Sequence, residues 1–337
     1  MSAAATQRPR PLRLLGCGVA EPELVSSAAL DQRLGLAPGT VEARSGVQTR
    51  PVHPGHAAAL GAQAARAALA SAALSPSEID LLLCASATGD QALPCNAALL
   101  QRELGWGGAG MPAFDLNASC LGFLVALEVV AALLNQRSFR RVLVVSADIA
   151  SCGLDWSTLE ASAIFGDGAA AAVFALPVAQ EDSALLSFGL ETYGDGADDC
   201  RIDAGGSRFH PSRVGAAAMA ARALFRMQPE RLYKRAARVL PALVERVLAQ
   251  AGLTRAEIAC VVPHQASHQG LAHMRKRLGL PAERFIDIYR DHGNQVAASL
   301  PTALHHAISS GALRRGQLAL LLGTGAGLSV GAAVLRY

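Results

Sequence analysis

The sequence predicts a layered α/β protein whose two similar halves each cover a β-sheet with helices. Helical and strand patterns alternate along the whole chain, which is typical of this class. The expected strands, such as 142–147, are continuous apolar runs, so both faces of each sheet are buried. A short internal repeat also recurs about half a chain apart, which indicates that the halves are duplicates.

The repeat joins the segment ALSPSEIDLLL at 73–83 to GLTRAEIACVV at 252–262. Each copy follows an alanine-rich helical stretch, contains a Ser/Thr-x-x-Glu capping box and leads into an apolar strand. The order helix, cap and strand is therefore the same in both copies. We expect two halves, 1–178 and 179–337, that meet near 177–182 and share an interface.

The expected elements follow from apolar periodicity and from glycine, proline and capping signals. Strands are predicted at 79–87, 112–116, 141–147, 168–175, 184–191, 258–262, 284–288, 317–323 and 328–335. Helices are predicted at 56–73, 94–104, 120–136, 229–251, 267–279 and 298–311.

The composition excludes a disordered chain and raises the question of a membrane span. Of the 337 residues 51% are hydrophobic and 17% charged, and the mean hydropathy is +0.28. The run 316–335 is uncharged and long enough to cross a bilayer. However, glycines interrupt it, and it reads as two short buried strands around a glycine turn. Because the N-terminus also lacks a signal-peptide core, we expect a cytoplasmic protein without a membrane span.

Positive charge is concentrated in the second half of the chain. Nine arginines and Lys234 lie between Arg201 and Arg246, against three acidic residues. This excess is typical of a solvated helix face, and it also suits an anionic partner such as a phosphate-bearing cofactor or an acidic protein. Aromatic residues make up only 4% of the chain and are not interleaved with basic ones, which argues against a nucleic-acid partner.

Seven cysteines are present, an odd number without a CxxC pair, so neither a disulfide framework nor a zinc site is expected. Cys120 differs from the others because a short apolar strand leads to it and a long apolar helix follows. At a helix N-terminus the dipole and free N–H groups favour a thiolate and can stabilise an oxyanion after attack on a thioester. The alternative is a packing cysteine in a buried helix.

Two further polar residues end apolar segments in the second half. His264 follows the strand 258–262, at the end of a strand where α/β proteins place their sites. Its spacing from His268 would also suit a metal, but no third ligand completes a metal-binding pattern. Asn294 lies in a Gly-Asn turn before a helix. Its side chain either only stabilises the turn or donates a hydrogen bond to a substrate carbonyl. Gly323, Gly325 and Gly327 form a glycine turn that offers backbone N–H groups to a site.

Taken together and in this order, these motifs resemble the β-ketoacyl-acyl-carrier-protein synthase III family of thiolase-fold condensing enzymes. The resemblance is carried by DLNASCLGF around Cys120, FGDGA at 165–169, PHQAS around His264, HGNQVAAS around Asn294 and the terminal GTGAGLSVGAAVLRY. It covers about residues 12–337. It implies a thiolase-like five-layer αβαβα fold of two duplicated halves and an obligate homodimer.

The resemblance also implies a mechanism. Cys120 would take an acyl group from a thioester, and the N–H groups of Cys120 and Ala326 would form the oxyanion hole. His264 and Asn294 would bind the carbonyl of a malonyl thioester while it loses CO₂, and the enolate would attack acyl-Cys120. No metal or redox cofactor is implied, since coenzyme A or the phosphopantetheine of an acyl carrier protein carries the substrates.

Several positions depart from the family pattern. Ser267 replaces the Asn of HQAN and Gln269 replaces a common Arg, whereas Arg44 matches the Arg that meets the nucleotide phosphates. Residues that often stack on adenine are replaced by Thr40 and Leu159, which favours an acyl carrier protein as donor. Leu93 matches a position that shapes the partner subunit's acyl pocket. Residues expected to contact substrate are Arg44, Leu93, Ser267 and Gly325.

We therefore expect an acyltransferase that makes a C–C bond, in specialised metabolism or in supplementary fatty-acid initiation. Two alternatives stay open at this point. One is an acyltransferase of the same fold that moves the acyl group to an oxygen or nitrogen acceptor without decarboxylation. The other is a non-catalytic partner subunit, against which the presence of Cys120, His264 and Asn294 argues.

Overall fold

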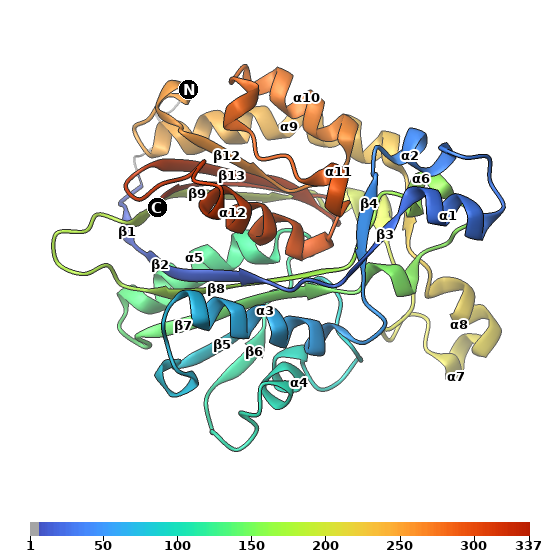
Figure 1. The fold of residues 1–337 in the computed structure, drawn as a ribbon, viewed down its shortest axis with the longest axis horizontal. Coiled ribbons are helices and arrows are strands. Elements are labelled where there is room, and N and C mark those ends of the chain that lie inside the picture. Colours follow the sequence, from blue (N-terminus) through green and yellow to red (C-terminus); the bar gives the residue numbers. More distant parts are fainter. Residues whose placement is uncertain (1–6) are drawn as a thin grey trace.

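The computed structural model describes residues 7–337 and consists of five layers, helix, sheet, helix, sheet and helix (Figure 1). Each of the two main sheets has five strands. The first contains, in spatial order, β2 (Arg13–Val19), β8 (Gly168–Ala175), β7 (Arg141–Asp148), β5 (Leu81–Cys84) and β6 (Ala113–Asp115). The second contains β1 (Arg10–Pro11), β9 (Ala184–Thr192), β14 (Ser329–Arg336), β13 (Leu318–Gly325) and β12 (Cys260–Pro263).

The two sheets repeat one topology, which confirms the duplication that the repeat predicts. In the first sheet β2, β8 and β7 are antiparallel and β7, β5 and β6 are parallel. In the second, β9, β14 and β13 are antiparallel and β13 is parallel to β12. A parallel bridge from Val261 to Phe285 takes the place of β6. The chain crosses between the sheets in the connection from β8 to β9, while β1 adds an edge strand to the second sheet.

The central layer consists of α5 (Gly122–Asn135) and α12 (Ser299–Ser309), which pack between the two sheets. The sequence of α5 is apolar around almost its whole circumference, as expected for a helix that packs between two sheets. Its one charged residue, Glu128, forms an ion pair with Arg10. The start of α5 lies in this central core through Leu121 and Phe123, and Cys120 directly precedes it.

The outer layers contain two helices on each side. The first sheet is covered by α3 (Ala57–Ser71) and α4 (Asn96–Glu103), and the second by α9 (Pro229–Gln250) and α10 (His268–Leu278). Both predicted capping boxes form, since Glu78 accepts from the N–H of Ser75 at 2.9 Å and Glu257 from that of Thr254 at 2.8 Å. They open the short 3-10 turns η1 (Pro76–Glu78) and η4 (Arg255–Glu257).

The predicted strand at 284–288 is wrong. Within the segment, Arg284 ends the 3-10 turn η5 (Ala282–Arg284), Phe285 makes a single bridge, and 286–288 are irregular up to helix α11 (Tyr289–His292). The reason is the Gln265 side chain, which accepts from the N–H of Ile288 at 3.0 Å and donates to the carbonyl of Ile286 at 3.1 Å. A side-chain amide therefore takes the backbone groups that a neighbouring strand would pair.

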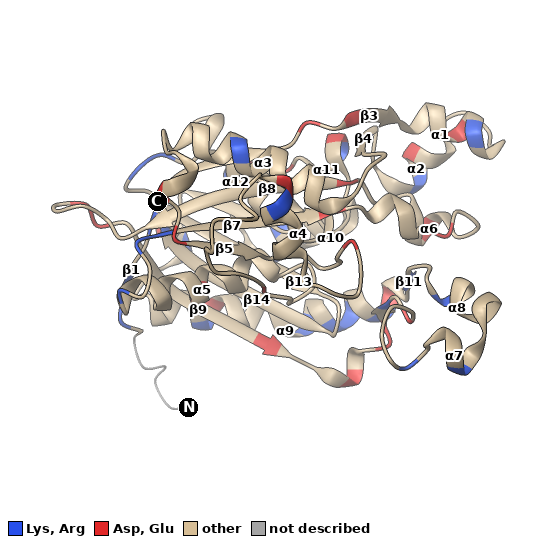
Figure 2. Ribbon diagram, turned by 90° about the horizontal axis from the view of Figure 1, so that it is seen from below, with Lys and Arg blue, Asp and Glu red and all other residues tan. Residues whose placement is uncertain are grey.

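Smaller elements surround one end of the layers, and the sequence did not predict them. They are β3 (Glu23–Ser26), α1 (Ser27–Leu34), α2 (Thr40–Ser45), β4 (Thr49–Val52), η2 (Ala150–Gly153), α6 (Leu159–Ser162), η3 (Gly194–Gly196), β10 (Cys200–Arg201), α7 (Pro211–Val214), α8 (Ala216–Arg222), β11 (Arg226–Met227) and η6 (Val296–Ala298). Strand β2 was also missed. Helices α7 and α8 stand away from the layers in both ribbon views (Figures 1 and 2).

The uncharged run 316–335 forms the antiparallel pair β13 and β14, as its glycine turn predicts. In the part of the chain that the structure describes, no helix is long and apolar enough to cross a membrane.

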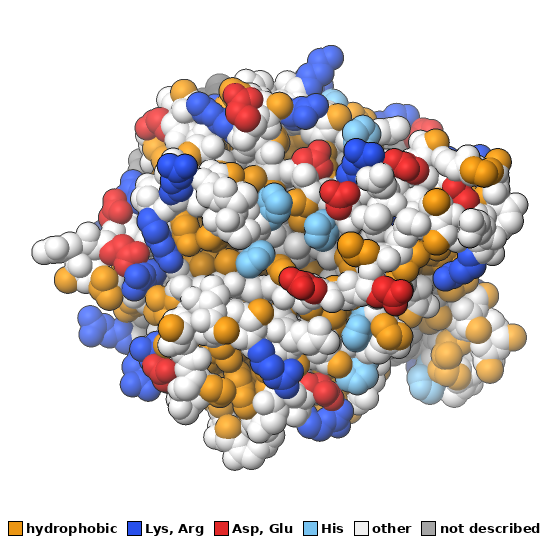
Figure 3. Space-filling model, in the orientation of Figure 1, with side chains coloured by type: hydrophobic (Ala, Val, Ile, Leu, Met, Phe, Trp, Pro, Cys, Tyr) orange, Lys and Arg blue, Asp and Glu red, His pale blue; other side chains and the backbone are white. Residues whose placement is uncertain are grey.

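The basic stretch 201–246 is partly neutralised by neighbouring carboxylates. Figure 2 shows Lys and Arg along α9 and at α7 and α8, with acidic residues on β9 nearby, and Figure 3 shows both signs of charge interspersed on one face. Half of the ten basic residues form ion pairs, so the solvated-face interpretation accounts for them. The pairs are Arg201 with Asp203, Arg231 and Arg235 with Asp199, Arg246 with Glu191, and Lys234 with Glu230.

Candidate active site

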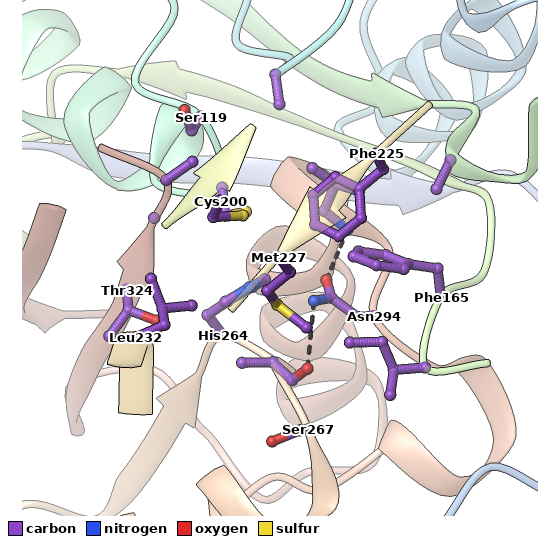
Figure 4. Close-up of a pocket in the computed structure, with 18 of the residues that line it drawn as sticks. Ser119, Phe165, Cys200, Phe225, Met227, Leu232, His264, Ser267, Asn294 and Thr324 are labelled. Carbon is purple, nitrogen blue, oxygen red and sulfur yellow. Dashed lines mark hydrogen bonds between the residues drawn. The ribbon is translucent and has the colours of Figure 1, made fainter. Parts of the chain in front are cut away.

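A single cavity brings together the three residues that the sequence singles out. Cys120, His264 and Asn294 all line it, and its volume is about 1600 Å³. Small-molecule sites usually enclose roughly 300–1,000 Å³. The cavity therefore has room for a substrate with a long arm in addition to its reacting group. Figure 4 shows His264, Asn294 and Ser267 around this space.

Cys120 lies in the turn between β6 and α5. The helix begins at Gly122, two residues later than predicted, and Leu121 is its N-cap. Ser119, directly before the cysteine, has a φ of +52°, which costs energy for any residue except glycine. The turn thus presents Cys120 to the cavity through a strained backbone.

The glycine turn between β13 and β14 packs directly against this cysteine and against His264. A Cβ on Gly323 would lie 2.6 Å from the Cβ of His264, and one on Gly325 would lie 3.6 Å from the N of Cys120. At Gly323 only glycine fits, because a side chain there would displace the histidine. The turn also brings the Ala326 N–H within hydrogen-bonding reach of the Cys120 thiol. The backbone N–H of Cys120 interacts with the same sulfur atom.

The electrostatics of Cys120 differ from the sequence prediction. The helix N-terminus was expected to favour the thiolate. Instead burial, followed by the nearby Cys200 and Asp148, raises the pKa of the thiol well above its ordinary value, and the two N–H groups offset this only in part. The resting nucleophile is therefore a neutral thiol, since desolvation outweighs the helix dipole.

His264 directly follows β12 and is almost completely buried. Its backbone N–H donates to the carbonyl of Leu322 at 2.8 Å, which ties it to β13. Its ring atom Nδ1 is buried without a hydrogen-bond partner among the described residues. Burial lowers the pKa of His264 to about 4, so the imidazole is neutral at pH 7. A neutral imidazole keeps one N–H to donate.

This burial predicts a pH dependence of stability. Because the pKa of His264 is about 4 in the folded chain and ordinarily 6.5, the unfolded chain binds the proton first. Stability from neutral His264 is complete above pH 6.5 and lost as the pH falls toward 4. Relative to a His264→Ala variant, wild type should lose about 3 kcal/mol of unfolding free energy over this window.

Chemical denaturation of both proteins at several pH values measures this difference, with His306→Ala as the control for an exposed histidine. Referring wild type to the variant cancels other titrating groups such as Asp148. A difference that stays constant from pH 6.5 to 4 would contradict the neutral buried imidazole.

Asn294 is held in one orientation by its neighbours. Its side-chain Oδ1 accepts from the N–H of Val296 at 2.9 Å, and its Nδ2 donates to the carbonyl of Ala266 at 3.3 Å. The second hydrogen of Nδ2 is not used by this bond. Asn294 thus stabilises the turn through these hydrogen bonds and also has one N–H left to donate at the cavity wall.

The FGDGA motif holds the Asn294 turn from the other half of the chain. The N–H of Asn294 donates to the carbonyl of Ile164 at 2.8 Å, and that of Gly166 donates to the carbonyl of Asn294 at 3.1 Å. Gly293, between His292 and Asn294, has a φ of +65°, and a Cβ there would lie 2.8 Å from the carbonyl oxygen of Ile164. The motif is therefore a docking surface between the halves.

The remaining predicted residues lie around the cavity in different ways. Arg44, Ser267 and Gly325 line it, whereas Leu93 does not and is 83% exposed. The hydroxyl of Ser267 caps α10 by accepting from the N–H of Gly270 at 3.1 Å. Arg44 pairs with Glu160 at 2.6 Å, an acid that the sequence did not single out.

Other lining residues escaped the sequence analysis. One wall consists of apolar side chains of α9 and α10, whose helical spacing is indistinguishable from an ordinary core stripe. A second thiol, Cys200, comes from the short strand β10. The lining residues that the sequence analysis did not single out include Cys200, Phe225, Met227, Leu232, Ala236, Leu240, Met274 and Leu278. Asp148, at the end of β7, was also missed, although a charge that ends an apolar strand is a visible signal.

Comparison with known proteins identifies the family. Residues 248–337 match the family model described as 3-oxoacyl-[acyl-carrier-protein (ACP)] synthase III C terminal, and residues 114–194 match that of 3-oxoacyl-[acyl-carrier-protein (ACP)] synthase III. The chain is 36% identical to the β-ketoacyl-[acyl-carrier-protein] synthase III of Sphingopyxis alaskensis over 96% of its length and 98% of that protein's. The chain belongs to the β-ketoacyl-[acyl-carrier-protein] synthase III family.

Solved structures agree with this assignment. The 3-oxoacyl-(acyl carrier protein) synthase III of Pseudomonas aeruginosa superposes with a TM-score of 0.86 at 34% identity, covering 97% of this chain and 98% of that one. The priming β-ketosynthase of the R1128 polyketide pathway gives 0.85 at 28% identity, covering 98% and 97%. The thiolase-like five-layer fold and the acyltransferase class are therefore both confirmed for this member of the family.

Proposed function

We propose that this protein catalyses a two-step reaction in which Cys120 is acylated and the acyl group is then condensed with a malonyl-type thioester. The observation that carries the proposal is the meeting of Cys120, His264 and Asn294 in one cavity, with the Ala326 N–H beside the thiol. In the first step the thiol attacks the thioester of the donor and its carrier leaves as a free thiol. The N–H groups of Cys120 and Ala326 stabilise the oxyanion.

In the second step the free donor of Asn294 and the N–H of neutral His264 bind the carbonyl oxygen of the malonyl thioester. Loss of CO₂ leaves an enolate on that oxygen, and both hydrogen bonds strengthen as its charge develops. The carbanion attacks acyl-Cys120 and the Cys120 thiolate leaves. These steps need neither a metal nor a redox cofactor. Transfer to an oxygen or nitrogen acceptor is not favoured, because Asn294 is retained as a donor.

Two measurements on the wild-type protein test this function. Intact-mass analysis against a panel of acyl-coenzyme A and acyl-carrier-protein thioesters should show one acyl group on Cys120. Release of ¹⁴CO₂ from a malonyl thioester should follow only when the acylated enzyme is present. Acylation without CO₂ release would support the acyltransferase alternative, and reaction with neither thioester would support a non-catalytic subunit.

We further propose that the acyl donor is an acyl carrier protein. Glu160 neutralises Arg44, the residue expected to meet nucleotide phosphates, and neither Thr40 nor Leu159 lines the cavity. Among residues 7–337, several basic side chains of α9 and α10 have no carboxylate partner, and Arg277 lines the cavity itself. They suit an acidic carrier that delivers its arm between the two helices. These side chains are Arg238, Arg275, Lys276 and Arg277.

Removing the competing acid should improve coenzyme A as a donor. In Glu160→Gln, Arg44 is free to bind phosphate, and the KM for acyl-coenzyme A should fall roughly tenfold, the equivalent of one charge-assisted hydrogen bond. The KM for the acyl carrier protein should not change. Steady-state loading with each donor measures the two KM values. Glu42→Gln is the control, because it also removes a carboxylate that pairs with an arginine of this region. Equal changes for both donors would contradict the assigned role of Glu160.

We also propose that the protein acts as a homodimer. Strand β6 lies at the edge of the first sheet and exposes 42% of Phe114. The exposed Leu93 does not line the cavity of its own subunit, although the two residues before it, Gln91 and Ala92, do. An unpaired edge strand and exposed apolar side chains such as Phe114 and Leu93 are unfavourable in water. Pairing of two β6 edges would cover the edge and would carry Leu93 toward the partner's cavity.

A charge on this edge should therefore separate the subunits. Sedimentation analysis should give twice the chain mass for wild type and the single-chain mass for Phe114→Glu, since an unpaired charge is costly in a buried interface. Leu24→Glu places the same charge on another exposed leucine and should leave the mass unchanged. A monomeric wild type would contradict the proposal.

A further inference from the structure

Asp148 closes strand β7 and lies completely buried between the two halves of the chain. Its carboxylate accepts four hydrogen bonds. Oδ1 accepts from the N–H of Ala87 at 3.0 Å and from the N–H and hydroxyl of Thr88 at 2.9 and 3.0 Å. Oδ2 accepts from the N–H of Ala297 at 3.1 Å. One side chain of the first half therefore holds the segment that follows Asn294 in the second.

That segment contains a strained residue. Val296 has a φ of +54°, which a β-branched side chain adopts only when its surroundings enforce it. On one side its N–H donates to Oδ1 of Asn294, and on the other the N–H of Ala297 donates to Asp148. The turn that orients the Asn294 amide is therefore strained and held from both ends.

The two segments that donate to Asp148, the loop at 87–88 and the turn at 296–297, do not depend equally on its carboxylate. On the Oδ1 side the loop has another tie, because Nδ2 of Asn117 donates to the carbonyl of Ala87 at 3.0 Å. On the Oδ2 side the N–H of Ala297 has Asp148 as its acceptor. Loss of the carboxylate should therefore release the Val296 turn first. Asp148 also raises the pKa of the Cys120 thiol, so its removal does not disfavour the nucleophile.

We propose that Asp148 is a positioning residue for the decarboxylation step. It holds the strained Val296 turn and so aims the Asn294 amide at the substrate carbonyl, while the acylation of Cys120 does not depend on it. The inference rests on the proposed function of Cys120 and Asn294, and it adds a residue that contacts neither substrate nor nucleophile.

The test separates the two half-reactions in Asp148→Asn, whose amide has nearly the same shape but cannot accept at both positions. Acylation of Cys120 is followed by intact mass in a single turnover, and decarboxylation by ¹⁴CO₂ release from malonyl thioester on the acylated enzyme. Rates are normalised to the fraction of loadable Cys120, which corrects for misfolded protein. Decarboxylation should fall roughly a hundredfold, as for a displaced catalytic group, while acylation changes little.

Two further variants distinguish positioning from general stability. Asp80 precedes β5, and its carboxylate accepts from the N–H groups of Arg140 and Arg141 at the start of β7, the end of that strand away from Asp148. Asp80→Asn should therefore leave both half-reactions unchanged. In the double variant Asp148→Asn/Val296→Gly, glycine adopts the positive φ without strain, so decarboxylation should partly recover.

The outcomes are distinct. A wild type that does not release CO₂ would reject the proposed function itself. With an active wild type, equal losses in both half-reactions, or no recovery on adding Val296→Gly, would assign Asp148 to structure alone and overturn the inference. Failure of both Asp148 variants to fold would do the same.

Discussion

Replacement of Cys120 by serine is expected to abolish acyl-enzyme formation and to lower overall turnover on the order of a million-fold, the size of effect seen when a covalent nucleophile is removed. The serine hydroxyl is far less nucleophilic than a thiol. Intact mass after incubation with the acyl thioester that loads wild type measures the loss directly.

The cavity provides its own matched control, because Cys200 is a second thiol that lines the same space. Cys200→Ser should load acyl groups as wild type does, because Cys200 comes from the short strand β10, whereas the N–H groups of Ala326 and Cys120 act on the Cys120 thiol. Acylation of Cys120→Ser at the wild-type rate, or an acyl group mapped to Cys200, would show that the nucleophile is assigned wrongly.

Replacement of Asn294 by aspartate should lower decarboxylation by roughly 10²–10³-fold, the loss that follows removal of one oxyanion donor, and leave Cys120 acylation intact. The carboxylate still accepts from the N–H of Val296, so the turn keeps that tie. It can no longer donate, however, and its charge repels the developing enolate. Release of ¹⁴CO₂ by the pre-acylated variant measures the effect.

The same chemical change at Asn135, which ends α5 at the surface and binds the carbonyl of Pro11, serves as the control. Asn135→Asp should decarboxylate like wild type. If Asn294→Asp instead loses acylation and decarboxylation equally, Asn294 has only a structural role. If it keeps both, the donor to the substrate carbonyl must be another group.

Sequence patterns predicted the layered fold because that fold depends on local signals. Continuous apolar runs such as 142–147 became β7, and the two capping boxes formed where the Ser/Thr-x-x-Glu spacing placed them. The segment 284–288 has the same local character, but the side chain of Gln265 occupies its backbone groups. A contact between residues more than twenty positions apart leaves no signal in the segment itself.

The candidate site was partly predictable for a similar reason. Cys120, His264 and Asn294 each follow an element boundary, which is visible in the chain. The cavity walls from α9 and α10, the Glu160 partner of Arg44 and the ties of Asp148 depend on which surfaces meet, and so they appeared only in the structure.

The sequence by itself determined the fold class and the duplication, and it predicted Cys120, His264 and Asn294 as the reacting residues. Only the tertiary structure decided their electrostatic state. Read locally, a cysteine before a helix should be a thiolate. In the folded chain burial dominates, raises the pKa of Cys120 and lowers that of His264, so that both are neutral at rest. The physical reason is that desolvation depends on every layer packed around the cavity, whereas the helix dipole depends on one helix.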